Sequence, residues 1–372
     1  MAVKLPSFDF GKIKDIFSFR SRSFLGIDVG TSAIRLVELS RRKSVFSLTN
    51  YGEVHSSALL KNKPFRIFYK NSVALSNKEV AQAISSIVEE AGIQTKEVSF
   101  SVPDFASFFT SFEIPAMDED EIPQAIQYEV RPYVPLPVDE VTLDWVVIAG
   151  QPSSTPLKVL VVAVPNDVVA QYQEIAQMAG LELKTLESEV FALARAANKY
   201  IEKKDDAKKV IGLLDLGARS TTCSIIEKGV LKSSHSFHVG GNELTEIVAK
   251  SLNIDYNRSE ELKLEIGLIP QGKKDLRSVL APLIDSILGE AKEVFRVFFM
   301  EEGREVEKVI LSGGVSMTPG FKEYCAASFK KPVVALSPFL NINHPKVLEK
   351  NLQKMNPFYA IAVGLALKGL EK

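Results

Sequence analysis

The chain of 372 residues is 46% hydrophobic and 24% charged, with a formal net charge of −1, and this length predicts two lobes or more. Without a basic excess to neutralise phosphates, the composition gives no support to a nucleic-acid-binding protein, and the two cysteines, Cys223 and Cys325, lack the spacing of a metal site or a disulfide framework. This cysteine usage fits a reducing cytosol best. No apolar run approaches the roughly 18 residues that a membrane-spanning helix needs.

Residues 1–23 form an N-terminal tail in which aromatic and basic residues are interleaved, as in KIKDIFSFRSRSF. Such a segment suits an amphipathic helix lying on an anionic membrane or docking on a partner. A disordered tail is the preferred alternative, because Pro6 and Gly11 weaken a helix.

Residues 24–97 predict the first subdomain of a lobe. The segment opens with FLGIDVGTSAIRLVELS, which predicts two strands joined by a glycine turn. Farther on, apolar residues recur at spacings of three and four, which predicts a helix from Asn77 to Gly92 with Asn77 as its cap. A strand in EVSFSVP follows.

Residues 98–185 differ in sequence pattern from the preceding segment and predict a small α+β insert. PAMDEDEIPQAIQYEV predicts a helix with Asp118 as its N-cap and Glu121 in the capping-box position. Three prolines in RPYVPLPVDEV then enforce extended backbone, and two strands, VTLDWVVIA and LKVLVVAVP, flank a turn. Residues 186–209, a helix followed by the charged segment EKKDDAKK, connect this insert to a second lobe.

Two glycine turns, half the chain apart, carry the same pattern. GIDVGTSAIRLVEL and LLDLGARSTTCSII share apolar–apolar–Asp–apolar–Gly, then small or hydroxyl residues, then a second strand. Self-similarity of this kind predicts two related lobes. Each turn presents backbone N–H groups that suit phosphate oxygens, while the preceding carboxylate repels phosphate but suits Mg2+. Asp28 and Asp215 are therefore the predicted metal ligands of a nucleotide held between the lobes.

A third glycine turn lies in EKVILSGGVSMTPGFKEY, between a hydrophobic strand and a helix that starts near Pro319. Adjacent glycines leave space for ribose or adenine against the backbone. The glycine spacing fits neither a Walker A loop nor a dinucleotide fingerprint.

These three elements, in this order, resemble the actin-like ATPase superfamily, and more specifically the family of the type IV pilus assembly protein PilM, which is related to the cell-division protein FtsA. The resemblance covers the chain from about Phe24 to its end. The segments that carry it are FLGIDVGTSAIRLVEL, EDEIPQAIQYEVRPYVPLPVDEVTLDW, VIGLLDLGARSTTCSII, VGGNELTEIVAKSLNIDYNRSEELKLEIG, VILSGGVSMTPGF and NPFYAIAVGLALKG.

The resemblance implies an α/β actin-like ATPase fold, with two ribonuclease-H-like lobes around a nucleotide cleft and a small FtsA-like α+β (SHS2) insert in the first lobe. It implies a second lobe built from residues 210–254, 255–305 and 306–344, with 345–372 returning to complete the first lobe. It further implies ATP and Mg2+ as ligands, and a bacterial cytoplasmic protein peripheral to the inner membrane, at the base of a pilus or a type II secretion-like machine. The implied partner is the short cytoplasmic N-terminal peptide of a PilN-like membrane protein, docked between the first subdomain and the insert.

The resemblance also implies four groups of site residues. These are the first phosphate turn at Asp28, Gly30, Thr31 and Ser32, the second at Asp215, Gly217, Ser220 and Thr221, the adenosine turn at Ser312, Gly313 and Gly314, and an adenine-side helix with Glu260 and Lys263. Ala218 departs from the glycine of many relatives, and Arg219 either adds positive charge near phosphate or points to solvent. Arg35 is expected to be a surface residue of a strand.

Asp215 is the predicted catalytic residue, acting through Mg2+ and water, whereas the sequence identifies no first-lobe residue that aims the attacking water. His235 and His238 lie three apart on a predicted strand and face opposite sides, which argues against a shared metal. Three functions stay open: a nucleotide-binding adaptor with slow or absent turnover, an FtsA-like or actin-like filament protein, and a small-molecule kinase. The insert argues against the kinase.

Overall fold

The computed structural model describes residues 22–56, 68–69, 72–73, 75–201, 206–270 and 275–371. The predicted tail, residues 1–23, lies outside these ranges except for its last two residues, which open the first strand. Residues 202–205 of the predicted charged linker also lie outside them. Within the described ranges, no helix combines the length and the apolar character needed to cross a membrane.

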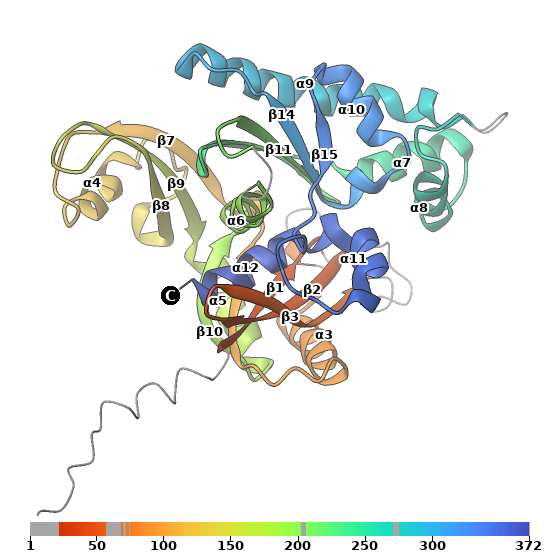
Figure 1. Cartoon of the computed structure of the whole chain (residues 1–372), viewed down its shortest axis with the longest axis horizontal. Helices are drawn as coiled ribbons and strands as arrows, with labels where there is room; N and C mark the ends of the chain where they lie inside the picture. Colours follow the sequence, from red (N-terminus) through yellow and green to blue (C-terminus); the bar gives the residue numbers. More distant parts are fainter. Residues whose placement is uncertain are drawn as a thin grey trace, which may run out of the picture.

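The first lobe is built on a five-stranded sheet in the order β10-β6-β1-β2-β3 (Figure 1). Its strands are β1 (Arg22–Val29), β2 (Ala33–Arg42), β3 (Val45–His55), β6 (Glu97–Val102) and β10 (Glu182–Ser188). The first three are antiparallel, whereas β6 and β10 add in parallel. The other elements of this lobe are β4 (Phe68–Tyr69), β5 (Ser72–Val73), α3 (Asn77–Glu90), α5 (Asn166–Met178), α11 (Glu349–Met355) and α12 (Ala360–Leu370). Helices α3 and α5 cover one face of the sheet and α12 covers the other.

Helix α3 begins where its sequence provides a complete capping box. The Ser76 hydroxyl accepts a hydrogen bond from the Glu79 N–H (3.3 Å), and the Glu79 carboxylate accepts one from the Ser76 N–H (2.7 Å). The prediction that Asn77 caps this helix is therefore wrong. The Asn77 side chain instead bonds Glu174 and Gln171 on α5, so it joins the two helices.

The second lobe repeats the plan of the first, with a sheet in the order β13-β12-β11-β14-β15. Its strands are β11 (Val210–Leu216), β12 (Thr221–Glu227), β13 (Val230–Phe237), β14 (Lys308–Ser312) and β15 (Val333–Ala335). One face is covered by α7 (Gly241–Leu252), α8 (Tyr256–Glu265), α9 (Arg277–Glu302) and α10 (Phe321–Phe329). Again three antiparallel strands are followed by two in parallel, which confirms the two related lobes predicted from the repeated turn.

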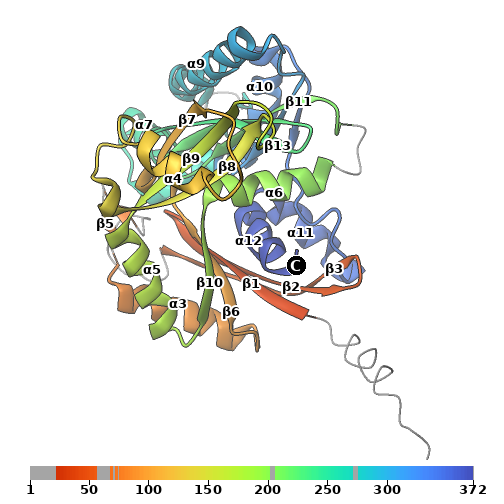
Figure 2. The same cartoon turned by 90° about the vertical axis from the view of Figure 1, so that its left-hand side faces the viewer.

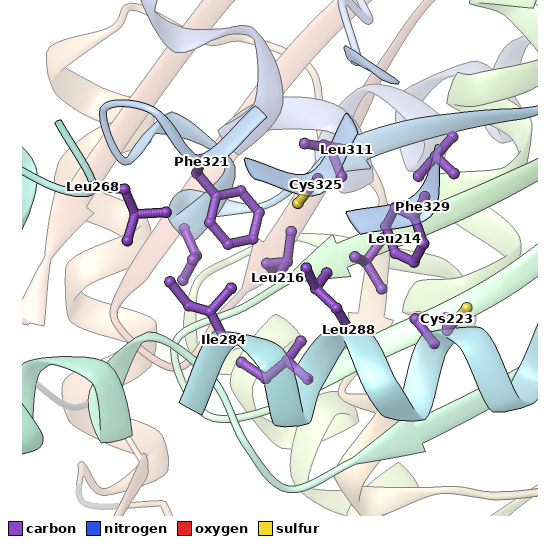
Figure 3. Close-up of a cluster of buried hydrophobic side chains, with 14 of the residues drawn as sticks. Leu214, Leu216, Cys223, Leu268, Ile284, Leu288, Leu311, Phe321, Cys325 and Phe329 are labelled. Atoms are coloured by element: carbon purple, nitrogen blue, oxygen red, sulfur yellow. The ribbon is translucent and has the colours of Figure 1, made fainter. Parts of the chain in front are cut away.

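Both faces of the second sheet are buried. Leu214 and Leu216 of β11 face the helices α7 to α10, where Cys223 and Cys325 also lie as buried free thiols (Figure 3). The alternate residue Leu213 faces α6 (Glu189–Ile201) on the opposite side. Helices α6 and α12 pack together between the two sheets (Figure 1).

The insert forms its own three-stranded sheet, in the order β7-β9-β8. Its elements are β7 (Phe108–Ile114), α4 (Ile122–Glu129), β8 (Val141–Ala149) and β9 (Leu157–Pro165). The last two strands have the predicted bounds, but β7 was not predicted. The separate sheet is smaller than the predicted insert, residues 98–185, because β6 and β10 belong to the first sheet and α5 packs beside α3. Figure 2 shows the insert above α5 and beside the second-lobe strand β13.

The helix of the insert starts later than its sequence predicts. Helix α4 begins at Ile122 and has no side-chain cap, so Asp118 is not its N-cap. One half of the expected reciprocal pair is present, because the Glu121 carboxylate accepts a hydrogen bond from the Asp118 N–H at 3.1 Å. Asp118 instead accepts a hydrogen bond from the Ser153 hydroxyl (2.5 Å), which ties the start of the helix to the β8–β9 turn.

Candidate functional site

Three glycine turns converge on one cavity of about 240 Å³ between the lobes. The first turn joins β1 to β2, the second joins β11 to β12, and the third follows β14. The predicted site residues that line this cavity are Asp28, Gly30, Thr31, Ser32, Asp215, Gly217, Ser220, Glu260, Lys263, Ser312, Gly313 and Gly314. Thr221 does not line it, because its buried hydroxyl donates a hydrogen bond to the Val239 carbonyl (2.7 Å). The neighbouring Thr222 lines the cavity instead.

The first turn sets a buried carboxylate opposite a buried guanidinium. Asp28 is 4% exposed, accepts a hydrogen bond from the Ser101 hydroxyl (2.8 Å), and pairs in register with Arg35 across β1 and β2. Burial raises the pKa of Asp28, and the charge of Arg35 opposes that shift. Arg35 also contacts Glu53 (3.1 Å) and lies 5.1 Å from the centre of the Phe358 ring. The prediction that Arg35 is a surface residue is therefore wrong.

The second turn presents Asp215 near the end of β11. Burial raises the pKa of Asp215 to about 6, against the effect of a hydrogen bond with Ser312 on the neighbouring strand β14. The nearby charge of Asp28 raises the pKa further. A buried carboxylate, Asp28, and a partly buried one, Asp215, thus face one cavity from different lobes. A bound cation stabilises such an arrangement.

Few side chains at the cavity are candidate metal ligands. Among the described residues, no three His, Cys, Asp or Glu side chains are grouped closely enough to hold a metal ion by themselves. Asp28 and Asp215 are hard oxygen donors, which suits Mg2+, a cation that usually keeps several waters and takes phosphate oxygens as further ligands. The residues present therefore fit Mg2+ that arrives with a nucleotide.

The third turn needs its glycine. Gly313 has a positive φ of 78°, and a Cβ atom there would lie 2.6 Å from the Leu216 carbonyl carbon, so the third turn packs directly against the second. The Ser312 hydroxyl donates to the Pro357 carbonyl at 3.3 Å. Pro357 belongs to the 3-10 helix η6 (Asn356–Tyr359), which leads into α12, so this turn also contacts the first lobe.

Helix α8 supplies a buried lysine to the cavity wall, and this lysine is bonded to α7. Lys263 is 3% exposed and donates to the Gly241 carbonyl (3.1 Å), the Thr245 hydroxyl (2.8 Å) and the Glu260 carboxylate (2.7 Å). Burial lowers the pKa of Lys263, and the charge of Glu260 opposes this. Glu260 and Lys263 thus form a fixed pair at the cavity, not an exposed pair on a helix face.

Two further carboxylates at the cleft were missed from the sequence. Glu189 is the first residue of α6, lines the cavity, and accepts a hydrogen bond from the Asp104 N–H (3.3 Å). Asp104 opens the 3-10 helix η2 (Asp104–Ala106), and its carboxylate accepts hydrogen bonds from Thr222 (2.6 Å) and Ser188 (3.3 Å). Glu189 comes directly after β10 and Asp104 two residues after the end of β6, but a single carboxylate after a strand is too common to identify a site.

These carboxylates raise one another's pKa values. Burial raises the pKa of Glu189 well above its ordinary value, and the charges of Asp104, Asp28 and Asp215 add to that effect. Burial raises the pKa of Asp104 to about 7, with the hydrogen bond from Thr222 opposing and the charge of Asp215 reinforcing the shift. These two carboxyl groups therefore bind protons more strongly in the folded protein than in the unfolded chain.

Removing the Asp104 charge should change how stability depends on pH. A carboxyl group whose pKa rises from 3.8 to about 7 on folding adds stability that is full at low pH and is lost as pH rises through this window. We therefore expect Asp104→Asn to raise the free energy of unfolding at pH 8, by about 1–3 kcal/mol relative to the wild type, and to have little effect at pH 4. Urea unfolding without Mg2+ at several pH values measures this; equal pH dependence in the two proteins would contradict it.

The amino-acid sequence is similar to those of two groups of known proteins. A family model described as type IV pilus assembly protein PilM matches residues 26–370. The cell division protein FtsA of Enterococcus faecalis is 23% identical over 393 residues, which cover 91% of this chain and 85% of that protein. FtsA of Pseudomonas aeruginosa is 21% identical over 397 residues, covering 94% of this chain and 90% of that protein.

Comparison with solved structures confirms the predicted fold. A structure described as the PilM-PilN type IV pilus biogenesis complex has a TM-score of 0.82 at 24% identity, covering 94% of this chain and 98% of that chain. MreB5 of Spiroplasma citri, bound to AMPPNP, has a TM-score of 0.53 at 14% identity, covering 95% and 96%. The chain therefore has the two-lobed α/β actin-like ATPase fold.

Proposed function

The chain belongs to the type IV pilus assembly protein PilM family, and on this premise we propose that it is a nucleotide-binding adaptor. Its cleft would hold Mg2+–ATP, and a groove beside the cleft would hold the cytoplasmic N-terminal peptide of a PilN-like inner-membrane protein. This peptide would keep the protein at the inner face of the membrane, at the assembly platform of a pilus or a type II secretion-like machine. The observation that carries the proposal is the convergence of three glycine turns and two carboxylates on one cavity.

Each part of the cavity suits one part of the nucleotide. The backbone N–H groups around Gly30 and Gly217 would bind phosphate oxygens, because glycine leaves them open to close approach. Asp28 and Asp215 would hold Mg2+, which neutralises phosphate charge when bound. The Ser312–Gly314 turn would lie against the ribose or the base, near the Glu260–Lys263 pair. The proposal is supported by the MreB5 structure, which contains a bound ATP analogue in the same fold.

We expect turnover to be slow. Besides Asp28, Glu189 is a first-lobe carboxylate on the cavity wall that could accept a proton from water, a role for which the sequence alone offered no residue. Its carboxylate already accepts a hydrogen bond from the Asp104 N–H, so one of its oxygens is held by the protein. The protein would bind ATP as a ligand that braces the two lobes, with little hydrolysis.

The peptide groove would be a second hollow, of about 800 Å³, between the first lobe and the insert. Its walls come from η2, α5, β7 and the 3-10 helix η3 (Val138–Glu140). Apolar side chains on these walls include Phe105, Phe108 and Leu136. Three carboxylates, Asp139, Glu140 and Asp167, lie exposed on its rim. These features suit a peptide that combines apolar residues with basic ones, and the proposal is supported by the similarity to a PilM-PilN complex.

A groove variant tests the partner assignment. Leu136→Glu would put a fourth carboxylate among the apolar groove residues, so we expect it to weaken binding of a synthetic PilN-like cytoplasmic tail by about tenfold or more. The matched control is Val347→Glu, on an apolar side chain that is 84% exposed and does not line the groove. Fluorescence anisotropy with a labelled tail measures both, and circular dichroism checks that both variants fold. Equal affinities for the two variants would place the tail elsewhere.

A further inference from the structure

The nucleotide cavity and the proposed peptide groove share part of one wall. Phe105, the middle residue of η2, lines both hollows. It is partly exposed and packs against the first-lobe core beside α5. A change in the position of this ring would therefore alter both sites at once.

The second lobe reaches into the groove through the phosphate turn itself. Arg219 lies between Gly217 and Ser220, which both line the nucleotide cavity, yet its own side chain lines the groove. Its guanidinium carbon is 4.0 Å from the centre of the Phe105 ring, which is a close cation–π contact between the lobes. The sequence left open whether Arg219 adds charge near phosphate or points to solvent, and in the structure its guanidinium lies over the Phe105 ring.

The residue before Phe105 makes a second contact between the lobes. The Asp104 carboxylate accepts a hydrogen bond from the Thr222 hydroxyl of β12 at 2.6 Å, and both groups are buried. On the first-lobe side, Ser188 bonds the same carboxylate. The short helix η2 is therefore bonded both to the first lobe and to the strand that follows the second phosphate turn.

From these contacts we propose that the groove is a surface of both lobes, completed by Arg219, so that nucleotide and tail peptide bind with positive coupling through Phe105. This inference rests on the proposed function. A nucleotide that bridges the two phosphate turns favours the arrangement of the lobes in which Arg219 covers Phe105. In this arrangement the groove has all of its walls. Linkage requires the reciprocal effect, so the peptide strengthens nucleotide binding by the same factor.

The test compares two phenylalanines of the same groove. Peptide affinity is measured by calorimetry with and without Mg2+ and a non-hydrolysable ATP analogue, and the ratio of the two affinities is the coupling. We expect a ratio of about 5 or more for the wild type, within the usual range for allosteric coupling. Phe105→Leu should bring the ratio to about 1, because leucine keeps the apolar wall and removes the aromatic face.

Phe108→Leu is the matched control. Phe108 lines the groove but not the nucleotide cavity, so this variant should bind the peptide less tightly and keep the wild-type ratio. If Phe105→Leu does not fold, Arg219→Gln tests the Arg219–Phe105 contact from the second lobe. This variant should also give a coupling ratio near 1. The insert also contacts the second lobe through Lys158 with Glu301 and Glu302, and these pairs stay intact in all three variants.

The outcomes separate this inference from the proposed function. If both ligands bind the wild type with a ratio near 1, or if the Phe105 and Arg219 variants keep the wild-type ratio, the coupling proposal is overturned and the adaptor function stands. If either ligand fails to bind the wild-type protein at all, the proposed function itself fails, and the coupling fails with it.

Discussion

Replacing Asp215 with asparagine is expected to weaken ATP binding in the presence of Mg2+ by about 10- to 100-fold, and to change metal-free ATP binding far less. Asparagine has the size of aspartate and keeps one side-chain oxygen at the same place, but it carries no charge to offer the cation. It also removes the mutual repulsion between Asp215 and Asp28, so the metal-free affinity has no reason to fall.

Calorimetric titration of ATP, with Mg2+ and with a chelator, measures both affinities in the same protein. Asp144→Asn is the matched control, because this carboxylate lies on β8 of the insert and does not line the cavity. An equal loss of affinity with and without Mg2+ would remove the carboxylate–metal role of Asp215 and leave it as a purely structural residue.

Gly364→Ala is expected to destabilise the protein by about 1–3 kcal/mol, or to prevent folding. A Cβ atom at this position of α12 would lie 2.5 Å from the Ala192 carbonyl carbon, in the backbone of α6. A helix backbone cannot move aside as a flexible side chain can, so the two helices between the lobes would have to separate. Because Glu189 opens α6, we also expect weaker nucleotide binding.

A second helical glycine gives the control for that change. Gly289 lies on α9, and a Cβ atom there would meet no atom within 4 Å. Gly289→Ala should therefore stabilise the protein by about 0.5–1 kcal/mol, since alanine favours a helix more than glycine does. Denaturant unfolding of both variants measures the difference; similar stabilities would show that the α6–α12 contact tolerates a larger separation than the structure indicates.

The local sequence pattern was enough to predict the strand–turn–strand unit that opens each lobe. The turns at Asp28 and Asp215 follow from apolar strands, a glycine and a second strand, all within a few residues. The insert boundary was harder, because β6 pairs with β1 and β10 pairs with β6 over long sequence separations. Nothing local to β10 distinguishes a strand of the first sheet from a strand of the insert.

The site was predictable where it is made of turns and not where it depends on tertiary contacts. The sequence predicts Thr221 as a residue of the cavity, whereas the adjacent Thr222 lines it. A difference of one residue places the side chain on the opposite face of β12. Glu189 enters the cleft because α6 runs between the lobes, and Arg219 lines the groove, where its guanidinium lies over the Phe105 ring. Such positions depend on packing between segments far apart in the chain.

The most direct test of the central claim is a calorimetric titration of the wild-type protein with a non-hydrolysable ATP analogue, with and without Mg2+. We expect binding of one molecule per chain that is markedly tighter when Mg2+ is present, since the cleft offers two carboxylates to the metal and two glycine turns to the phosphates. Absence of binding in both conditions would contradict the account. The turns would then be parts of a scaffold, and the protein would act without a nucleotide.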